Sequence, residues 1–456
     1  MNLQRIETPG IAHFSYLLVD GEKALVVDPR RDVDVYLREA QKQGAHVTHI
    51  LETHRQEDFV MGSTELARLT GAKVANGQHD FFGRGDLRLA DSEEMSFSSL
   101  HIRALSTPGH TPESMCYAVY TPNADTPWCI FTGDTLFFGE TGRTDLPDDT
   151  RSEDNARMLY DSVQQKLAGL GDTALVLPAH GPGSVCGSGM ADRPMSTLGE
   201  EKQYNVVFTK DRETFAKDKG GERLPRPPYF RLMEKVNLEG GRAMAAPPGA
   251  VPLLSLDDFS KRMSDAQVYD TREPEAFAGG HIEDAYSIWL GGLPVFGGWV
   301  AEADEPILLV TDRDSDITTA GLHLARIGYD NLAGAMAGGF GAWRKSANRV
   351  MHSGVITPVE LHEDRETYQI LDVREPDEFS AGHIDGAHSL YVGYLERDLE
   401  ALDLDRERPV VVTCGVGHRA GLGVSMLKRM GFKDVRNLIG GMSAWQAMKL
   451  PTRSGD

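Results

Sequence analysis

The second half of the chain contains a long internal repeat, which restricts the possible fold more than any other feature. Residues 270–285 and 372–387 are identical at nine of sixteen positions. The same offset of 102 residues (372 minus 270) places Thr311 on Thr413. A repeat of this length is a duplicated domain, because the units of solenoid proteins span only about 20–50 residues.

Each copy of the repeat alternates short apolar strands with helical stretches. Residues 306–311 and 409–413 are unbroken runs rich in valine, isoleucine and leucine. Such runs are typical of parallel strands that are buried in an α/β domain. Because a chain of 456 residues corresponds to about three domains, we predict an α/β multidomain protein.

The domain boundaries follow from the repeat and from a proline-rich segment before it. We expect a first domain at residues 1–235, a linker at 236–252, and the two copies at 253–348 and 352–456. Residues 247–249, with the sequence P-P-G, are the stiffest part of the linker, because proline restricts the backbone.

Composition excludes several classes of partner. The chain has 47 basic and 68 acidic residues, a formal net charge of -21, and such a surface repels nucleic acid and anionic membranes. No run approaches the roughly 18 apolar residues of a transmembrane helix, and the first ten residues lack a secretory pattern. The four cysteines form no C-x-x-C pair, so we expect a protein of the reducing cytoplasm.

Four motifs in the first domain carry side chains that can bind a metal ion. His54, His110, Asp134 and His180 each follow a short strand-like run. Loops at strand ends are where a rigid sheet usually presents its chemical groups. The four motifs therefore indicate a metal site at the ends of the strands.

Two helical signals complete the first domain. Ser152 is predicted to be the N-cap of a helix whose apolar stripe begins at Leu159. Residues 197–235 are predicted to be partly helical, with Thr197 and Glu200 in capping-box spacing.

The ordered set of metal-binding motifs resembles the metallo-β-lactamase superfamily, whose first motif usually reads T-H-x-H-x-D-H. In this chain Gln56 and Phe59 stand at the second and third histidine positions. The resemblance implies an αββα sandwich for the first domain. It also implies that the full ligand set of a two-zinc hydrolase is missing, because each lost histidine removes one ligand.

The remaining residues His54, His110 and Asp134 look like the metal ligands of the persulfide dioxygenases in this superfamily. The resemblance implies one Fe(II) per chain, with zinc as the alternative, held by two histidines and one carboxylate as in non-haem iron oxygenases. The G-R-T-D run at residues 142–145 is similar to theirs as well. The arginine of that run helps to hold the thiol cosubstrate in the family, so Arg143 is a candidate for substrate binding; the alternative is a surface ion pair.

Three further residues of the first domain are candidates for the same site. Asp58 and His180 match positions of the family's second zinc site. We expect Asp58 to support a metal ligand and His180 to contact substrate or water, unless both are retained for structure alone. Cys186 lies in a glycine-rich loop, where its thiol could carry a persulfide near the metal or could remain packed and inert.

The repeated half resembles the rhodanese (sulfurtransferase) family over both copies. The second copy carries the loop C-G-V-G-H-R at residues 414–419 before a helix-like stretch. Backbone N–H groups of such a loop form an anion cradle that favours a thiolate and can solvate a persulfide. We predict that Cys414 accepts sulfur and that Arg419 supplies a cation for an anionic donor. His418 is expected to tune the choice of acceptor or to be simply exposed.

The first copy lacks these residues. At the 102-residue offset Asp312 replaces Cys414 and Ile317 replaces Arg419. A carboxylate cannot carry sulfane sulfur, so we expect this copy to be inactive and to serve for docking or spacing. The D-x-R-E-P and G-H-I elements occur in both copies, so we expect them to hold the fold.

Together these resemblances imply an enzyme of sulfide or persulfide detoxification. The iron site would oxidise a low-molecular-weight persulfide with O2 to sulfite, and Cys414 would form or use thiosulfate; both directions of transfer fit the sequence. The thiol could be glutathione, coenzyme A, bacillithiol or a protein cysteine. We expect a homo-oligomer.

Two alternatives from other classes stay open. One is a zinc thioester hydrolase that resembles glyoxalase II and holds two zinc ions. The other is a sulfur-carrier or regulatory binding protein whose first domain is catalytically inactive.

Overall fold

The computed structural model describes residues 1–80, 82, 84–146, 148–244, 246–247 and 250–455. Of the predicted linker, Ala245, Pro248 and Gly249 lie outside these residues. Within the described ranges, no helix combines the length and the apolar character needed to cross a membrane. The chain divides into two compact units. The first consists of Met1–Arg226, Phe230–Met244 and Arg326–Gly328; the second consists of Pro227–Tyr229, Ala245–Ala325 and Tyr329–Asp456.

The first unit is built on two six-stranded sheets. The first sheet has the strand order β1-β2-β3-β4-β5-β6, and the second has the order β12-β11-β10-β9-β8-β7. The strands are β1 (Asn2–Thr8), β2 (His13–Asp20), β3 (Lys23–Val27), β4 (His46–Leu51), β5 (Lys73–Gly77), β6 (Leu87–Leu89), β7 (Glu94–Phe97), β8 (Leu100–Ser106), β9 (Met115–Tyr120), β10 (Cys129–Gly133), β11 (Leu175–Pro178) and β12 (Ser196–Thr197).

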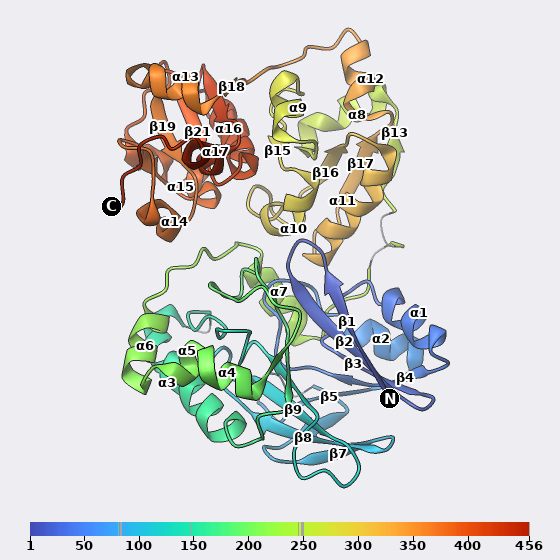
Figure 1. Ribbon diagram of the computed structural model, residues 1–456. Helices are drawn as coiled ribbons and strands as arrows, with labels where there is room; N and C mark the ends of the chain where they lie inside the picture. Colours follow the sequence, from blue (N-terminus) through green and yellow to red (C-terminus); the bar gives the residue numbers. More distant parts are fainter. Residues whose placement is uncertain (81, 83, 147, 245, 248–249, 456) are drawn as a thin grey trace. The chain divides into compact units, whose positions relative to one another are not determined.

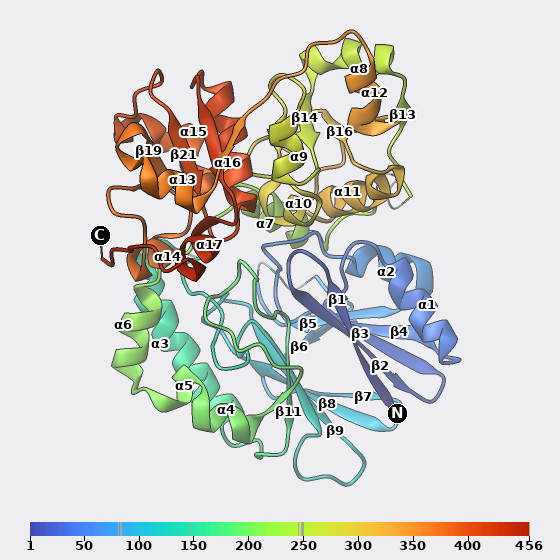
Figure 2. The same ribbon diagram turned by 45° about the horizontal axis from the view of Figure 1, so that its top comes forward.

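Helices cover the outer face of each sheet, as Figures 1 and 2 show. Side chains alternate along each strand, so Leu18 and Phe131 fill the space between the sheets, whereas their neighbours Leu17 and Ile130 pack under the helices. This αββα sandwich confirms the predicted fold of the first domain. The helices of this unit are α1 (Asp34–Lys42), α2 (Ser63–Thr70), α3 (Ser152–Ser162), α4 (Leu198–Tyr204), α5 (Val206–Thr209), α6 (Arg212–Gly220) and α7 (Phe230–Leu238).

The strands bring the four metal-binding motifs to one edge of the sandwich. β10 pairs in parallel with β11, and both β8 and β10 pair antiparallel with β9, so β8, β10 and β11 run in the same direction. His110, Asp134 and His180 follow the ends of these three strands, and His54 follows the end of β4 in the other sheet.

The two helix-cap predictions had different outcomes. Thr197 caps α4 as predicted, because its side chain accepts a hydrogen bond from the Glu200 backbone N–H at 3.3 Å. The prediction for Ser152 is wrong, since Ser152 is already the first residue of α3. A 3-10 turn at Asp149–Arg151 precedes it, and the Asp148 carboxylate caps that turn. The earlier carboxylate captures the first free N–H group, so the chain begins to wind before Ser152.

The second unit contains two five-stranded sheets in which the described strand pairings are all parallel. Their orders, β13-β17-β16-β14-β15 and β18-β22-β21-β19-β20, are the same arrangement in successive copies. This confirms two parallel α/β domains. The strands are β13 (Leu253–Leu254), β14 (Gln267–Asp270), β15 (Tyr286–Ser287), β16 (Ile307–Val310), β17 (Leu332–Met336), β18 (Gly354–Ile356), β19 (Gln369–Asp372), β20 (His388–Ser389), β21 (Val410–Thr413) and β22 (Val435–Leu438).

The helices of the second unit also correspond between the copies. They are α8 (Leu256–Arg262), α9 (Pro274–Gly279), α10 (Leu293–Phe296), α11 (Asp314–Arg326), α12 (Gly339–Lys345), α13 (Pro358–Glu363), α14 (Pro376–Ala381), α15 (Leu395–Asp398), α16 (His418–Arg429) and α17 (Gly441–Ala447).

The predicted offset of 102 residues between the two copies does not hold at one strand. β14 pairs Asp270 with Val310 of β16, whereas β19 pairs Asp372 with Thr413 of β21. The equivalent strand of the second copy is therefore displaced by 103 residues (413 minus 310) rather than 102. One additional residue lies between β19 and the end of β21.

Thr311, rather than Asp312, consequently takes the structural place of Cys414. A second contact gives the same correspondence, because the Thr311 carbonyl packs against Gly339 as the Cys414 carbonyl packs against Gly441. A hydroxyl cannot carry sulfane sulfur any more than a carboxylate can. The correction therefore leaves the prediction of an inactive first copy unchanged.

A buried ion pair anchors each copy in the same way. Arg374 donates to both oxygens of Asp372, at 2.9 and 2.7 Å, and to the Gly382 carbonyl at 2.8 Å. Arg272 makes the equivalent bonds to Asp270, at 2.8 and 2.6 Å, and to the equivalent glycine carbonyl at 2.7 Å. These contacts place the D-x-R-E-P element in the scaffold of both copies, and its role in holding the fold stays a prediction.

We expect Arg374→Ala to destabilise the second copy by about 3–5 kcal/mol, because it leaves the Asp372 carboxylate buried without a partner. Differential scanning calorimetry of the full chain should show one transition moved to lower temperature. Arg397→Ala is the matched control, since Arg397 pairs with Asp398 on the surface and should contribute no more than about 1 kcal/mol. Equal effects of the two substitutions would contradict the anchoring role.

Candidate metal centre and sulfur-transfer loop

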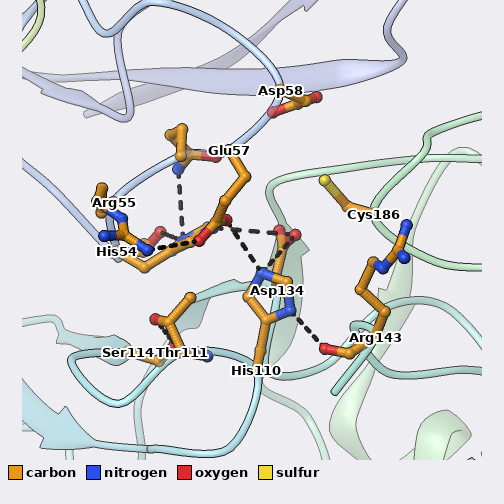
Figure 3. A network of polar contacts seen from close by, with 12 residues as sticks. His54, Arg55, Glu57, Asp58, His110, Thr111, Ser114, Asp134, Arg143 and Cys186 are labelled. Carbon is orange, nitrogen blue, oxygen red and sulfur yellow. Dashed lines mark hydrogen bonds and ion pairs between the residues drawn. The ribbon is translucent and has the colours of Figure 1, made fainter. Parts of the chain in front are cut away.

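Three side chains that are distant in the sequence meet in the first unit (Figure 3). His110 Nε2 lies 3.4 Å from Asp134 Oδ2, and His54 Nε2 lies 3.9 Å from the same oxygen. All three residues are buried, and their ligand atoms lie within 4.8 Å of one another. The structure thus brings together the three residues that were predicted to be metal ligands.

Hydrogen bonds fix the orientation of both imidazole rings. His110 Nδ1 lies 2.8 Å from the Arg143 carbonyl oxygen and donates to it. His54 Nδ1 lies 2.9 Å from Thr53 Oγ1, which donates its own proton to Asp28 and therefore accepts from the ring. With Nδ1 used in this way, each ring presents Nε2 to the cluster.

The atoms at the centre of the cluster fit a metal ion. Among the described residues, His54 Nε2, His110 Nε2 and Asp134 Oδ2 find no hydrogen-bond partner although they are buried. Buried polar atoms are nearly always paired, so three unpaired atoms that converge need a common partner. Two imidazoles and a carboxylate are ligands that zinc and iron both accept.

Burial and neighbouring charges shift the pKa values in the cluster. Burial lowers the pKa of His54 to about 4. Burial also opposes a charge on His110, but the carboxylates of Asp134 and Glu57 outweigh it and raise the pKa of His110 to about 9. Burial disfavours the charge on Asp134 as well, yet the surrounding histidines, His180 above all, hold its pKa well below the usual value.

A second buried group adjoins the first and contains Asp58, His180 and Cys186. His180 Nδ1 lies 2.9 Å from Asp134 Oδ1, and His180 Nε2 lies 3.0 Å from Asp58 Oδ2. Burial opposes a charge on this ring, but the two carboxylates raise the pKa of His180 well above its usual value. The imidazolium can therefore donate to both carboxylates, and it holds Asp134 in position.

Cys186 is enclosed in the same group. Burial raises the pKa of its thiol well above the usual value, so this sulfur carries its proton and is not an activated thiolate. The substrate roles of Cys186 and His180 stay predictions.

Arg143 is buried, and its guanidinium is bonded on several sides. It donates to both oxygens of Asp145, at 2.7 and 2.6 Å. It also donates to three main-chain carbonyls, of Val185, Pro225 and Leu224, at 3.0, 3.0 and 3.1 Å. These bonds use all five N–H groups of an arginine. A substrate anion would have to displace one of these acceptors, and binding of substrate by Arg143 stays a prediction.

Glu57 also lies beside the metal cluster, although nothing in the motif comparison marks it as a ligand. Its Oε2 lies 3.6 Å from His110 Nε2 and 4.0 Å from His54 Nε2. One signal in the sequence could have indicated it. Glu57 is an acidic residue inside the first motif, beside Gln56, where the family has a histidine.

The predicted sulfur-transfer loop lies at the end of β21 in the second unit. Cys414 is buried, and the Gly417 backbone N–H donates to its Sγ at 3.1 Å. Gly417 has a φ of 110°, a backbone angle that residues other than glycine rarely adopt. Bonds from Met442 N–H to the Cys414 carbonyl and from Asn437 Nδ2 to the Gly417 carbonyl, at 2.8 and 2.9 Å, fix the loop. The sulfur therefore lies beside the N-terminus of α16.

The two basic residues of the loop have acidic partners. Arg419 forms a two-point pair with Glu378, at 2.6 and 2.7 Å, so an anionic donor would share this guanidinium with a carboxylate. His418 Nε2 lies 3.0 Å from Glu273 Oε2, and the ring stacks on Trp289 at 4.8 Å. The catalytic roles of Arg419 and His418 stay predictions.

The folds and sites define a fusion protein in which a metallo-β-lactamase domain precedes two rhodanese-like domains. Residues 8–180 match the metallo-beta-lactamase superfamily, and residues 255–346 and 357–448 each match the rhodanese-like domain.

The chain is similar to a persulfide dioxygenase, to a probable metallo-hydrolase and to a solved metallo-beta-lactamase. The mitochondrial persulfide dioxygenase ETHE1 of Homo sapiens is 27% identical over 255 residues, which cover 52% of this chain and 88% of that protein. A probable metallo-hydrolase of Burkholderia pseudomallei (strain 1710b) is 28% identical over 284 residues, covering 53% and 94%. The crystal structure of a metallo-beta-lactamase from Staphylococcus aureus subsp. aureus COL has a TM-score of 0.65 and 28% identity, and covers 74% of this chain and 98% of that one.

We expect the affinity for Zn(II) or Fe(II) to increase with pH below about 9. The pKa of His110 is raised to about 9, so its proton must leave before Nε2 can bind a metal. Below that pH each unit increases the deprotonated fraction, and with it the affinity, by up to about tenfold. His54 contributes little, since its pKa of about 4 leaves it already neutral. Anaerobic competition with a chromophoric chelator, corrected for the protonation of the chelator, measures the profile; a flat profile would contradict a proton on His110.

Proposed function

We propose that the first domain is an Fe(II)-dependent persulfide dioxygenase and that the second rhodanese copy is a sulfurtransferase. The observation that carries the first part is the convergence of unpaired, buried ligand atoms from His54, His110 and Asp134. Two histidines and one carboxylate are the ligand set of non-haem iron oxygenases. The similarity to human persulfide dioxygenase supports the same assignment.

In the proposed reaction one persulfide, one O2 and one water give sulfite, the parent thiol and two protons. When bound, Fe(II) would supply the redox chemistry that lets O2 react with a persulfide sulfur. His54 and His110 supply neutral donor atoms, and Asp134 supplies a negative charge that His180 holds in place. The burial of the cluster limits the access of bulk water to the reacting atoms.

Cys414 is proposed to exchange sulfane sulfur with an anionic donor. Its thiolate attacks the outer sulfur of thiosulfate, the S–S bond breaks, and sulfite leaves with the electron pair. The reverse reaction, from the persulfide of Cys414 to sulfite, forms thiosulfate. The Gly417 N–H, 3.1 Å from Sγ, supports this role because it stabilises a negative sulfur. Sulfite links the two domains, and fusion raises its local concentration.

A two-zinc thioester hydrolase is the second candidate function. The group of Asp58, His180 and Cys186 supports it, because these residues place a second set of ligand atoms beside the first. Gln56 and Phe59 argue against a two-zinc hydrolase, because they replace two histidines of the superfamily motif. Metal content distinguishes the candidates, since persulfide oxidation needs one iron per chain.

The test is anaerobic reconstitution of the full chain with iron, followed by O2 uptake with glutathione, coenzyme A and bacillithiol persulfides. We expect His110→Ala to lower O2 uptake at least about tenfold, since loss of a ligand weakens metal binding. Cys414→Ser should keep O2 uptake and lose thiosulfate exchange. His101→Ala is the control, because His101 is an exposed histidine of β8, and it should behave like the wild type.

Three outcomes would overturn all or part of the proposal. Iron-loaded protein that consumes no O2 with any of the persulfides removes the oxygenase assignment. Two zinc ions per chain together with thioester hydrolysis establish the second candidate. Thiosulfate exchange that survives Cys414→Ser removes the sulfurtransferase assignment.

A further inference from the structure

The loop of the first motif turns a second carboxylate toward the metal cluster. Glu57 is fully buried, and its Oε2 lies 3.6 Å from His110 Nε2 and 4.0 Å from His54 Nε2. Like the three candidate ligand atoms, Glu57 Oε2 has no hydrogen-bond partner among the described residues. Figure 3 shows its side chain pointing at the same space as His54, His110 and Asp134.

The position of this carboxylate is set by the protein around it. The other oxygen, Oε1, lies 3.4 Å from Arg55 Nη2. Asn237 of α7 is hydrogen-bonded to the loop on both sides of Glu57. Its Nδ2 donates to the carbonyls of Gln56 and Phe59 at 2.7 and 2.8 Å. Asn237 Oδ1 also accepts from the Met61 backbone N–H at 2.9 Å. These bonds hold the loop in a conformation that leaves Glu57 Oε2 facing the cluster.

The lost histidine of the motif does not fill this place. Gln56 Nε2 lies 3.4 Å from His54 Nδ1, so its amide is beside the ring nitrogen that faces away from the cluster. Glu57 is the neighbouring residue whose donor atom reaches Nε2 of both histidines. An acidic oxygen from the position after Gln56 therefore faces the cluster.

We propose that Glu57 is a fourth protein ligand of the metal, so that the site holds its ion with two histidines and two carboxylates. The inference rests on the metal centre of the proposed function and extends it. Ligand atoms about 2.0–2.2 Å from one ion lie roughly 3–4.4 Å from each other. The separations between the two histidine Nε2 atoms and the two carboxylate oxygens, 3.4, 3.6, 3.9 and 4.0 Å, fall in this range.

The rival interpretation is that Glu57 only forms an ion pair with a protonated His110. The two interpretations differ in what a substitution does to the bound ion. A carboxylate that only pairs with the imidazolium does not touch the ion, so its replacement leaves the Co(II) spectrum unchanged. A carboxylate that binds the ion adds a bond, so its replacement decreases the affinity and changes the spectrum.

Metal affinity of the full chain tests the proposal independently of turnover. The protein is stripped of metal without oxygen, and Co(II) is titrated against a competing chelator while the visible absorption of bound Co(II) is recorded. We expect Glu57→Gln to lower the affinity at least about tenfold and to change the Co(II) spectrum. Glu57→Asp keeps the charge but withdraws the oxygen by one methylene, so it should also weaken binding if the contact is direct.

Glu113→Gln is the matched control. Glu113 is a second buried carboxylate beside the loop, but its Oε1 accepts from the Arg55 backbone N–H at 3.2 Å, and an amide oxygen can do the same. The affinity of the Glu113→Gln variant for Co(II) should stay within about twofold of the wild-type value, which is the normal scatter for a neutral change.

Unchanged or higher affinity with an unchanged Co(II) spectrum in both Glu57 variants would overturn the proposal. If the variants do not fold, a crystal structure of the metal-loaded wild type tests the proposal instead. A Glu57 oxygen at about 2.0–2.3 Å from the ion supports the proposal, and a distance beyond about 3 Å overturns it. Failure of the proposed function is a separate outcome, since wild-type protein could bind Co(II) through Glu57 and still consume no O2 with persulfides. A wild type that binds no metal overturns both.

Discussion

The buried carboxylate of Asp134 is the group on which the arrangement of the first domain's site depends. A charge without water is stable only when it is paired, and the two oxygens of Asp134 face different partners. Oδ1 receives a bond from His180, which is held in turn by Asp58. Oδ2 faces the two candidate histidine ligands. Once His110 has lost its proton, the carboxylates of Asp58, Glu57 and Asp134 face two cations, the His180 imidazolium and the Arg55 guanidinium beside Glu57. The remaining excess of negative charge favours a metal cation between them.

The sequence was sufficient to predict the fold class and the three residues that meet in the metal cluster. The reason is that each motif directly follows a strand, and strands that run in the same direction deliver their C-terminal loops to one edge of a sheet. The short-range cap at Thr197 could be predicted for a similar reason, because a side chain that bonds a backbone N–H three residues away needs no information about the rest of the fold.

The contacts that could not be predicted depend on residues far along the chain. Arg143 is bonded to carbonyls 42 to 82 residues away, and no local pattern indicates such partners. Glu57 was missed because its role depends on Asn237, which lies 178 and 181 residues from the two carbonyls that it holds. The correspondence of Thr311 with Cys414 required the strand register, since one additional residue in the second copy changes the alignment only across a single strand.

The two rhodanese-like copies share the buried pair of the scaffold and differ at the loop of the proposed sulfur transfer. The buried Asp–Arg pair is the same in both, but the ends of the following helices differ. The first turn of α11 carries Asp314 and Asp316, whereas the first turn of α16 has no acidic residue among those described. The N-terminus of a helix attracts negative charge. In the first copy the chain's own carboxylates occupy that position, and in the second the position is left for the sulfur of Cys414. The residues of the loop can therefore change without loss of the buried pair, because the loop and the scaffold depend on different residues.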